Sequence, residues 1–507
     1  LGDVYKRQRL INPLPQRMLS RSAKPGKRKG KADAVAWRSL RPRLTHQNGR
    51  SLGPGGYIST RMSGTGMRRP PGWVCMVAWI VLAPFHFGYG VSELNALEKV
   101  WVCKPSTTTA CLGMTEDDFG LATAMFTIGG TIASLLCAPA ARYAYAGRRA
   151  CLLMCASLAL VSSLLLSSTT HTKMISMARL VYGLCAGIAN VQTPLYLQEL
   201  APPAIRGAIG TLNQLAVVIG IFTAQLVGTW AVTWHHPWQR VPQVSAAVAL
   251  LQLIVGYVWA CESPGWLEGD GTALGVGSAA AAAQIRSRLG CTNGAYERVH
   301  AQDAPMLGAD ERSPRTWARG IRIVVVTQVA QQLSGVNAIM YYSTGIMSRV
   351  LPHLAPFVGL LITLVNIVMT LPPLWLIDDA RFGRRRLLLL SATSMGLCCF
   401  VLAWALMRSY AWLSSVSILL VMASFAVGLG PVPFVILPEV LPPSDVSLGS
   451  SIGLGLNWLT NIVVALSFQP LRRLLGTWDG QTGSLVFVVL GVLNLAFASL
   501  IRRMYTT

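Results

Sequence analysis

Long stretches of almost unbroken hydrophobic residues recur along the chain and are separated by short polar segments. A helix that crosses a lipid bilayer needs roughly 20 mainly apolar residues. Twelve stretches come near this length, six on each side of a polar region around residue 300: 73–89, 119–138, 151–166, 175–197, 207–228, 244–260, 321–347, 357–377, 387–407, 412–437, 449–468 and 485–501. The pattern therefore predicts an all-α membrane protein with twelve transmembrane helices in two six-helix halves.

Composition agrees with this prediction. Only 12% of the 507 residues are charged, whereas roughly 25% is usual in soluble proteins. Hydrophobic residues make up 52% of the chain, and the mean hydropathy is +0.48. These values exclude a cytosolic enzyme, and the sequence carries no nucleotide-binding loop, metal cluster or nucleophile elbow. We therefore expect no enzymatic activity, no cofactor and no metal.

The spacing of the cysteines does not indicate a metal site. The chain has eleven cysteines, without metal-ligand spacing, and most of them fall inside the predicted spans. Small, soft side chains are ordinary packing residues there. Cys103 and Cys111 share the first loop outside the membrane, where a disulfide is an open alternative.

Residues 1–72 differ sharply from the rest. They hold 17 Lys and Arg against two Asp, which accounts for +15 of the net charge of +23. High charge with low hydropathy predicts a disordered cytoplasmic tail. An Arg-rich transit peptide and a nucleic-acid-binding arm are alternatives, but no nucleic-acid partner is expected because aromatic residues are not interleaved with the charges. A further alternative is that the chain begins at Met62 or Met67.

The remaining basic residues predict the orientation, because Lys and Arg accumulate in cytoplasmic loops. They are densest at 142–149, 286–322 and 381–386. We therefore expect an integral, multi-pass protein with both termini in the cytoplasm. The predicted parts are the tail 1–72, an N-terminal bundle 73–262, a cytoplasmic linker with short helices 263–320, and a C-terminal bundle 321–507.

The two halves repeat two short motifs. Residues 197–203 read Leu-Gln-Glu-Leu-Ala-Pro-Pro, and residues 437–443 read Leu-Pro-Glu-Val-Leu-Pro-Pro. Gly-Arg-Arg occurs at 147–149 and again at 383–385. Parallel six-helix repeats around a site at the middle of the membrane are typical of secondary carriers, in which one half rocks against the other.

Longer motifs carry a resemblance to a known family. Residues 331–344 read Gln-Gln-Leu-Ser-Gly-Val-Asn-Ala-Ile-Met-Tyr-Tyr-Ser-Thr, and residues 428–433 read Gly-Leu-Gly-Pro-Val-Pro. Pro-Leu-Tyr at 194–196, Arg-Gly at 206–207, Glu-Ser-Pro at 262–264 and Asn-Trp at 457–458 agree with them. From residue 73 to about residue 501 the chain resembles the sugar porter family of the major facilitator superfamily, which includes the facilitative glucose and hexose transporters. A shorter match at 87–95 resembles a fungal, vacuole-associated branch.

The resemblance implies a binding site for a neutral sugar. A sugar ring is rimmed by hydroxyls that each donate and accept hydrogen bonds, and amide side chains offer both functions. Aromatic faces can stack on the ring. By resemblance the substrate-binding residues are Gln214, Gln331, Gln332, Asn337, Asn366, Asn457 and Trp458, with Tyr341 and Tyr342 in an outer gate. The alternative is that these amides only join neighbouring helices.

The resemblance also implies a cytoplasmic gate made of salt bridges. Its carboxylates would be Glu199, Glu262 and Glu439, and its cations would be Arg148, Arg149, Arg206, Arg384 and Arg385. Such bridges close the inside and break when the site opens inward. Simple anchoring by arginines at the membrane surface is the alternative interpretation.

Some positions depart from the family pattern. Gly90 stands where proton-coupled members have Asp, which favours facilitated diffusion. Arg179 is a basic residue well inside a predicted span, and an intramembrane charge indicates function. Glu93 lies one helical turn from Gly90, so a displaced Glu93–Arg179 pair is open. His86, where Gln is usual, is interpreted as a packing residue.

The second half departs more. Ala426 and Phe434 replace a Glu and a Trp of the family's tenth span. Ala380 and Val446 replace charged partners of the gate. We therefore expect an intact salt-bridge layer in the N-terminal half and an eroded one in the C-terminal half, with a looser inner gate or an altered substrate preference.

The sequence thus predicts a carrier that moves a hexose or related polyol by alternating access and facilitated diffusion. We expect it to act as a monomer in the plasma membrane or the vacuolar membrane. The alternatives are a carrier for quinate, inositol or a similar substrate, and a non-transporting sensor or trafficking factor with the same fold.

Overall fold

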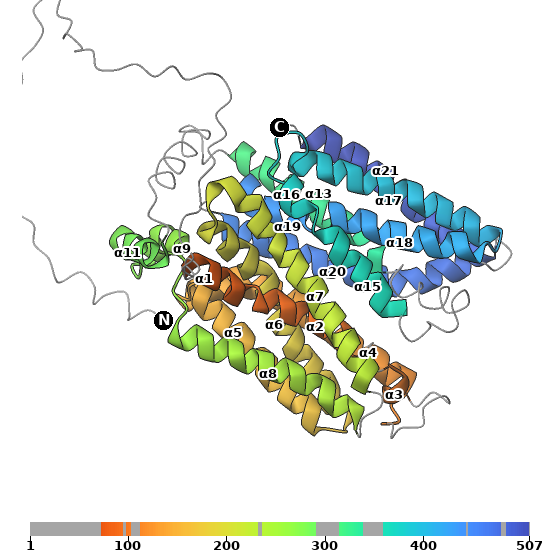
Figure 1. The fold of residues 1–507 in the computed structure, drawn as a ribbon, viewed down its shortest axis with the longest axis horizontal. Coiled ribbons are helices and arrows are strands. Elements are labelled where there is room, and N and C mark those ends of the chain that lie inside the picture. The colour runs from red at the N-terminus through yellow and green to blue at the C-terminus, as the bar shows by residue number, and fades with distance from the viewer. Residues whose placement is uncertain are drawn as a thin grey trace, which may run out of the picture. The chain divides into compact units, whose positions relative to one another are not determined.

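The computed structural model describes residues 72–94, 98–102, 112–231, 236–290, 314–337, 358–442, 445–477 and 483–505. Residues 1–71 of the predicted tail, the predicted gate residues Tyr341 and Tyr342, and the Cys103–Cys111 alternative lie outside these residues. The described part belongs to one compact unit, and Figure 1 shows it as a bundle of long helices.

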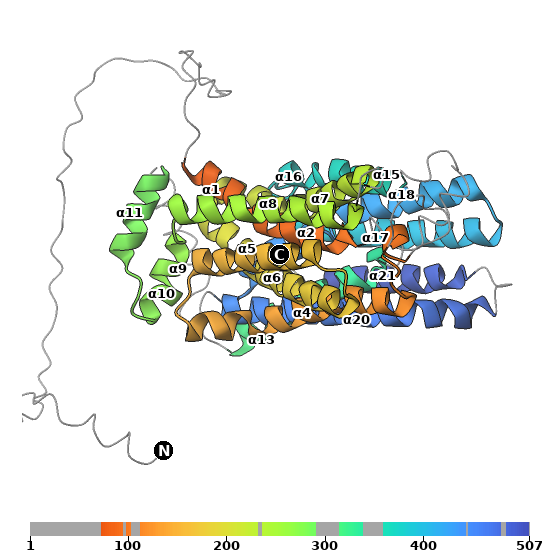
Figure 2. The same cartoon turned by 90° about the horizontal axis from the view of Figure 1, so that it is seen from below.

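The first half consists of long helices joined by short turns: α1 (Gly72–Ile80), α2 (Leu82–Glu93), α3 (Glu98–Trp101), α4 (Glu116–Tyr143), α5 (Arg148–Ser168), α6 (Thr172–Leu200), η2 (Pro203–Ile205), α7 (Arg206–Ala231) and α8 (Pro237–Val258). Three short helices follow: α9 (Pro264–Glu268), α10 (Asp270–Ala273) and α11 (Ala279–Leu289). Figure 2 shows α9, α10 and α11 at one end of the bundle. They fall within the stretch predicted as a linker with short helices.

The second half begins at Pro314 rather than at residue 321. Its helices are α13 (Pro314–Leu333), α15 (Val358–Thr370), α16 (Pro373–Leu376), α17 (Gly383–Met407), α18 (Ala411–Val427), α19 (Val432–Val440), α20 (Val446–Gly476) and α21 (Leu485–Met504). Across both halves, 11 helical stretches of the described residues are long and apolar enough to cross a membrane. The remaining predicted span, 321–347, coincides with α13 and then runs beyond the described residues.

Most long helices extend about a turn past the predicted spans, through polar residues in their end turns. At the start of α4, the Thr115 hydroxyl accepts a hydrogen bond from the Asp118 amide at 3.1 Å. Glu116, Asp117 and Asp118 occupy the first turn, where carboxylates are favoured by the helix dipole. A search for apolar residues alone therefore places this start too late, at residue 119.

Glycines allow helices of the first half to approach closely. A Cβ on Gly88 would lie 1.8 Å from the Val217 carbonyl oxygen, and one on Gly183 would lie 2.1 Å from the Phe126 carbonyl oxygen. These contacts join α2 to α7 and α4 to α6. Small residues serve this purpose between membrane helices, where backbone contact replaces hydrophobic driving force.

The two halves meet through equivalent helices. The second long helix of the first half, α4, packs against the fifth of the second half, α20; reciprocally, α7 packs against α15. One hydrophobic core is centred on α1, α4, α5 and α6 and takes in residues of α13, α19 and α20, and another is centred on α17, α18, α19 and α21. This reciprocal packing agrees with two pseudo-symmetric halves.

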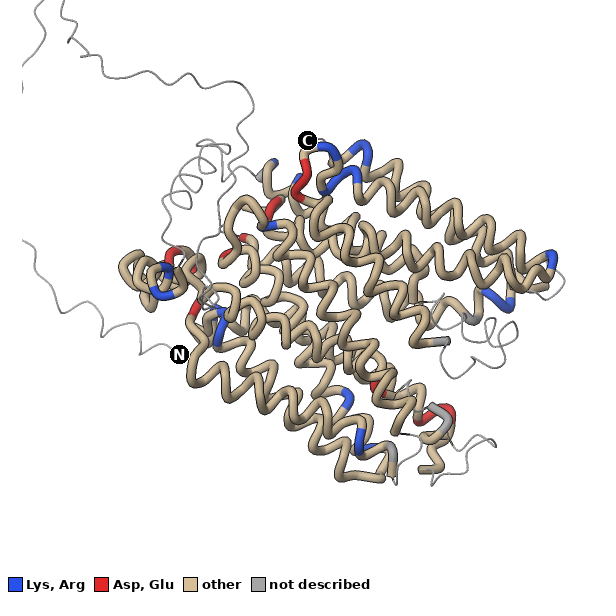
Figure 3. Tube along the Cα trace, in the orientation of Figure 1, with Lys and Arg blue, Asp and Glu red and all other residues tan. Residues whose placement is uncertain are grey.

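Most of the described charges lie at one end of the bundle, which we call the arginine end because the turns before α5 and α17 lie there. Figure 3 shows blue and red segments at this end and long uncharged stretches between the ends. The arginine end also carries the start of α13 and the end of α21.

Candidate functional site

A break between α18 and α19 exposes backbone carbonyls near the middle of the bundle. Gly428, Leu429 and Gly430 interrupt the helix, and Gln331 of α13 donates from Nε2 to the Leu429 and Gly430 oxygens, both at 2.9 Å. Gln328 donates to the Pro433 oxygen at 3.2 Å. Gln331 thus binds carbonyls within the break, where the helical hydrogen bonding is interrupted.

Asn457 of α20 lies at the centre of a group of amides. Its Nδ2 donates to Oε1 of Gln331 at 2.8 Å and to Oε1 of Gln328 at 3.0 Å. Its Oδ1 accepts from Nε2 of Gln332 at 3.0 Å. The Oε1 of Gln332 accepts from Asn337 at 2.9 Å and from Asn461 at 3.1 Å. We call these six residues of α13, α20 and the segment after α13 the amide cluster.

Four predicted substrate-binding residues, Gln331, Gln332, Asn337 and Asn457, therefore lie in one hydrogen-bonded group. Gln214 of α7 lies beside it, because a Cβ on Gly430 would be 3.5 Å from its Nε2. The described hydrogen bonds of Asn366 are instead local, with Thr370 Oγ1 donating to its carbonyl at 2.6 Å. The structure thus does not join Asn366 to the cluster.

Aromatic rings from the first half cover the Trp458 side of α20. The Trp458 ring lies 5.3 Å from that of Phe87 and 5.8 Å from that of Phe126, both in edge-on geometry. Its indole N–H is buried and has no hydrogen-bond partner among the described residues. Sequence reasoning did not find Phe87 and Phe126, because single aromatics in apolar helices carry no distinguishing signal.

A buried ion pair lies in the first half. Arg179 Nη1 is 3.3 Å from Glu93 Oε2, and both side chains are 2% exposed. The guanidinium carbon also lies 4.5 Å from the Phe126 ring centre, a cation–π distance. The displaced pair that the sequence left open is therefore present as a contact, and its role stays a prediction.

Tyr182 occupies the space above Gly90. A Cβ on Gly90 would lie 2.1 Å from Cε1 of Tyr182, so a carboxylate side chain at this position would need that ring to move. The Tyr182 hydroxyl contacts Ser245 Oγ at 2.6 Å and His86 Nδ1 at 3.5 Å. His86 is fully buried against this tyrosine, in agreement with its interpretation as a packing residue.

At the arginine end of the first half, Arg148 binds several partners. Its Nη2 lies 3.0 Å from Glu199 Oε1 and 3.5 Å from Asp270 Oδ2. The same nitrogen donates to Ser447 Oγ of α20 at 3.1 Å, and Ser447 donates to Asp270 at 3.1 Å. This group therefore joins the first half, the short helix α10 and the second half.

The Glu262 carboxylate accepts hydrogen bonds from backbone amides rather than from an arginine side chain. It accepts hydrogen bonds from the Arg149 amide at 3.0 Å and from the Ser263 amide at 2.9 Å, at the start of α5. Burial raises the pKa of this carboxyl, and the two amide hydrogen bonds lower it. A Cβ on Gly147 would lie 2.2 Å from Glu262 Oε2, which explains the glycine of the Gly-Arg-Arg turn.

The C-terminal layer is not eroded, so that expectation is wrong. Arg384 Nη2 lies 2.8 Å from Glu439 Oε1 and 3.1 Å from Asp378 Oδ1. Asp378 also accepts hydrogen bonds from the Gly207 amide at 3.1 Å and the Ala208 amide at 2.8 Å. An acid two positions before Ala380 thus supplies a second carboxylate and caps the first turn of α7 in the other half.

Two predicted gate arginines donate to backbone carbonyls instead of the predicted carboxylates, and a third, Arg206, forms no ion pair among the described residues. Arg149 donates to the Gly256 oxygen at 2.9 Å, and Arg385 donates to the Arg502 oxygen at 3.0 Å. Arg206 Nε is buried without a hydrogen-bond partner among the described residues. The ion pairs of the predicted gate are therefore those of Arg148 and Arg384.

This architecture defines a membrane carrier built from two six-helix halves. The sequence profile of the sugar (and other) transporter family matches residues 74–504. The chain therefore belongs to the sugar (and other) transporter family, as predicted. Because this is a family of transporters, the prediction that the chain is not an enzyme is also confirmed.

Individual proteins similar to this chain are also transporters. A probable metabolite transport protein of Saccharomyces cerevisiae is 28% identical over 457 residues, which cover 83% of this chain and 90% of the relative. The human solute carrier family 2, facilitated glucose transporter member 4, is 29% identical over 447 residues, covering 82% and 84%. The Escherichia coli proton:xylose symporter XylE, bound to 6-bromo-6-deoxy-D-glucose, superposes with a TM-score of 0.72 at 22% identity, covering 85% of this chain and 95% of XylE. The all-helical major facilitator fold is thus confirmed, and the chain is an integral, multi-pass membrane protein.

Proposed function

We propose that the chain carries a neutral hexose or related polyol by alternating access, as facilitated diffusion. The observation that carries this proposal is the amide cluster beside Trp458. Its members bond to one another, so they supply matched donors and acceptors that a ring of hydroxyls can replace one for one. Relatives named as facilitated glucose transporters support the same substrate class.

In this mechanism Gln332, Asn337 and Asn457 release their mutual hydrogen bonds and take up sugar hydroxyls. Trp458 offers its ring face and its unpartnered indole N–H. Gln331 keeps the α18–α19 break in place through the Leu429 and Gly430 carbonyls. We therefore assign Gln331 chiefly to positioning and Gln332 to direct binding.

The environment of Gly90 supports facilitated diffusion. Tyr182 fills the space that a proton-carrying side chain at this position would need. Arg179 contacts Glu93, which disfavours a carboxylate substrate that would require this cation. An organic acid such as quinate is therefore the weaker candidate.

The proposal includes the wider arrangement. The arginine end faces the cytoplasm, since basic residues remain on that side, and both termini lie there. The parts follow the predicted order with the helix bounds of the structure: a tail that ends before Gly72, a first bundle up to residue 262, a linker, and a second bundle that begins with α13 at Pro314. Because one chain contains the whole site, a monomer in the plasma or vacuolar membrane is sufficient.

Uptake of labelled glucose into proteoliposomes tests the proposal, with and without a pH gradient. We expect uptake independent of the gradient. Loss of a buried hydrogen-bonding group costs about 1–3 kcal/mol, so Gln332→Leu should lower kcat/KM about tenfold or more. Gln252→Leu is the matched control, because this buried amide of α8 has no side-chain partner among the described residues.

Two outcomes would overturn the proposal. One is uptake driven by the pH gradient, which would replace facilitated diffusion by proton coupling. The other is equal activity of the Gln332 and Gln252 variants, which would remove the amide cluster from the binding site. Sugar binding without any uptake would favour the non-transporting sensor.

A further inference from the structure

A buried serine of the second half binds the break between α18 and α19. Ser391 lies in α17 and is fully buried. Its Oγ donates to the Ser424 carbonyl at 2.6 Å and accepts from the Leu429 amide at 2.9 Å. One hydroxyl of a third helix therefore joins the last turn of α18 to the residue within the break.

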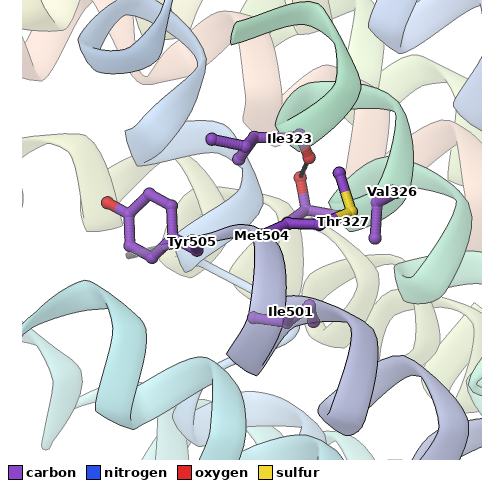
Figure 4. A pocket seen from close by; sticks show the side chains of 6 residues that line it. All are labelled: Ile323, Val326, Thr327, Ile501, Met504 and Tyr505. Carbon is purple, nitrogen blue, oxygen red and sulfur yellow. Dashed lines mark hydrogen bonds between the residues drawn. The ribbon is translucent and has the colours of Figure 1, made fainter. Parts of the chain in front are cut away.

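Several other buried hydroxyls bond only within their own helix. Thr327 of α13 donates to the Ile323 carbonyl at 2.9 Å, as Figure 4 shows. Ser417 of α18 donates to the Leu413 carbonyl at 2.7 Å. Such a bond returns to the preceding turn of the same helix and joins nothing else. Ser391 differs because both of its hydrogen bonds reach another part of the chain.

The backbone of the break explains why a hydroxyl fits there. In a continuous helix each amide donates to the carbonyl four residues earlier. The Gly428 amide donates instead to the Phe425 oxygen at 3.3 Å, and the Gly430 amide donates to the same oxygen at 2.9 Å. The Ser424 carbonyl and the Leu429 amide thereby lack their helical partners. A serine hydroxyl is a donor and an acceptor at once, so one side chain satisfies both groups.

The close approach of α17 to the break depends on a glycine. A Cβ on Gly428 would lie 2.3 Å from the Leu387 carbonyl oxygen and 2.6 Å from Cβ of Ser391. A larger residue at 428 would therefore push α17 away from the break. Because α17 also packs against α18, the hydroxyl is held in place by two long helices.

The amide cluster binds the same residue of the break from its other side. The Leu429 carbonyl accepts from Gln331 Nε2 at 2.9 Å, and Gln331 Oε1 accepts from Asn457 at 2.8 Å. A continuous series of hydrogen bonds thus runs from Ser391 through Leu429 and Gln331 to the centre of the cluster. Loss of the first bond frees residue 429 to turn, and this shifts the acceptor on which Gln331 depends.

The equivalent position of the first half holds a thiol. The two Gly-Arg-Arg motifs begin at 147 and 383, 236 residues apart, and the same step back from Ser391 leads to Cys155. Its Sγ donates to the Cys185 carbonyl at 3.4 Å. That carbonyl belongs to α6, which continues unbroken from Thr172 to Leu200. The hydroxyl therefore occurs in the half whose neighbouring helix is broken.

We propose that Ser391 is a positioning residue of the sugar site. It holds the break between α18 and α19 in the shape in which Gln331 binds the Leu429 carbonyl and presents its own oxygen to Asn457. The inference rests on the proposed function, because it takes the amide cluster as the place where the sugar binds. It adds a side chain that acts on this cluster through the backbone of the break.

Equilibrium binding of labelled glucose to the purified full chain tests this role. We expect Ser391→Ala to weaken binding about fivefold, the factor that corresponds to one lost hydrogen bond. Ser162→Ala is the matched control. This serine of α5 is also buried, and its hydroxyl donates to another helix, at the Ala178 carbonyl of α6, at 2.6 Å. The control should leave glucose binding unchanged.

A double-mutant cycle with Gln331 distinguishes positioning from general destabilisation. Gln331→Met removes the amide at nearly constant length and should weaken glucose binding roughly tenfold. If Ser391 acts through Gln331, the double variant binds about as weakly as Gln331→Met alone. Independent effects would instead multiply to about fiftyfold. Thermal unfolding in detergent identifies any variant that fails to fold.

Hydrogen–deuterium exchange of the segment 424–433 tests the hydrogen bond itself, without sugar and without a second substitution. Ser391→Ala should speed exchange of the Leu429 amide about fivefold or more, because this amide then has no acceptor in α17. Ser162→Ala should not change it.

Three results would overturn the inference: glucose binding by Ser391→Ala that equals that of Ser162→Ala, effects of Ser391→Ala and Gln331→Met that multiply, or an unchanged exchange rate of the Leu429 amide. Failure of the proposed function looks different, since glucose binding would then be absent or insensitive to Gln332→Leu, and both proposals would fall. Weaker binding that depends on Gln331, together with faster exchange, supports the inference.

Discussion

The two Gly-Arg-Arg turns make similar ion pairs and hydrogen bonds. The first arginine of each turn pairs with the glutamate of its own half, Arg148 with Glu199 and Arg384 with Glu439. The second arginine of each turn donates to a backbone carbonyl on the last long helix of its half, at Gly256 in α8 and at Arg502 in α21. The repeated sequence therefore produces a repeated set of contacts.

The turns differ in the additional carboxylate. In the first half, Glu262 accepts from the Arg149 amide, so it caps α5 within its own half. In the second half, Asp378 accepts from the first amides of α7, across the boundary between the halves. Both turns contact the other half, the first through the Arg148–Ser447 hydrogen bond, but only at the second does the additional carboxylate bind the backbone of the other half. This difference predicts separate effects on stability and on opening.

The largest expected effect is on stability, from Arg148→Gln. The change leaves Glu199 and Asp270, which are 21% and 39% exposed, without their cation, and loss of hydrogen bonds to a charged group costs about 1.5–3 kcal/mol. Thermal unfolding in detergent should show the loss. Arg385→Gln is the control, and equal losses in both variants would contradict the special position of Arg148.

The second-largest effect is expected from Asp378→Ala, which should favour opening of the arginine end between the two halves. Removing the two cap hydrogen bonds from α7 costs about 1–2 kcal/mol in the closed arrangement. We therefore expect the population open at the arginine end to rise about tenfold. Distances between spin labels at exposed positions 144 and 380, introduced as non-natural amino acids, measure this population.

Asp379→Ala provides the control for opening. This neighbouring acid is exposed, and its carboxylate accepts from the Arg381 amide at 2.6 Å within the same turn. If Asp379→Ala opens the protein as much as Asp378→Ala, the contact across the halves is not what keeps the end closed.

A smaller and equal effect is expected from the second arginines. Arg149→Gln removes the donor of the Gly256 and Tyr257 carbonyls, and Arg385→Gln removes that of the Arg502 carbonyl, so each should lower the free energy of unfolding by about 1 kcal/mol. Urea-dependent unfolding can compare them. If the free energies of unfolding of the two variants differ by several kcal/mol, the second arginines do not play equivalent roles.

The smallest effect should come from Ser447→Ala. The hydroxyl accepts from Arg148 and donates to Asp270, but those two groups also contact each other. The change should cost about 0.5–1 kcal/mol and open the arginine end less than Asp378→Ala does. The same spin-label distances decide the order.

The sequence predicted the fold because apolar length and repeated motifs are properties of the chain itself. Eleven of the twelve predicted spans coincide with described helices, and the four amides at 331, 332, 337 and 457 meet as the family motif implied. Three of them lie on α13 and α20, which pack along each other, and Asn337 follows the end of α13.

The contacts across the halves could not be predicted in the same way. Asp378 lies two positions from the expected acid, and its role depends on the approach of α7, which is far away in the sequence. Likewise, Phe87 and Phe126 could not be identified as site residues from the sequence, because only the packing of α2 and α4 brings their rings against Trp458. A one-dimensional pattern contains no distance between such residues.

The most direct test of the central claim is an experimental structure of the full chain with glucose bound. The account predicts sugar hydroxyls within roughly 2.7–3.2 Å of Gln332 and Asn457, with the ring against Trp458 and the mutual amide hydrogen bonds broken. A sugar bound elsewhere, with the hydrogen bonds that join Asn457 to Gln331 and Gln332 intact, would contradict this account.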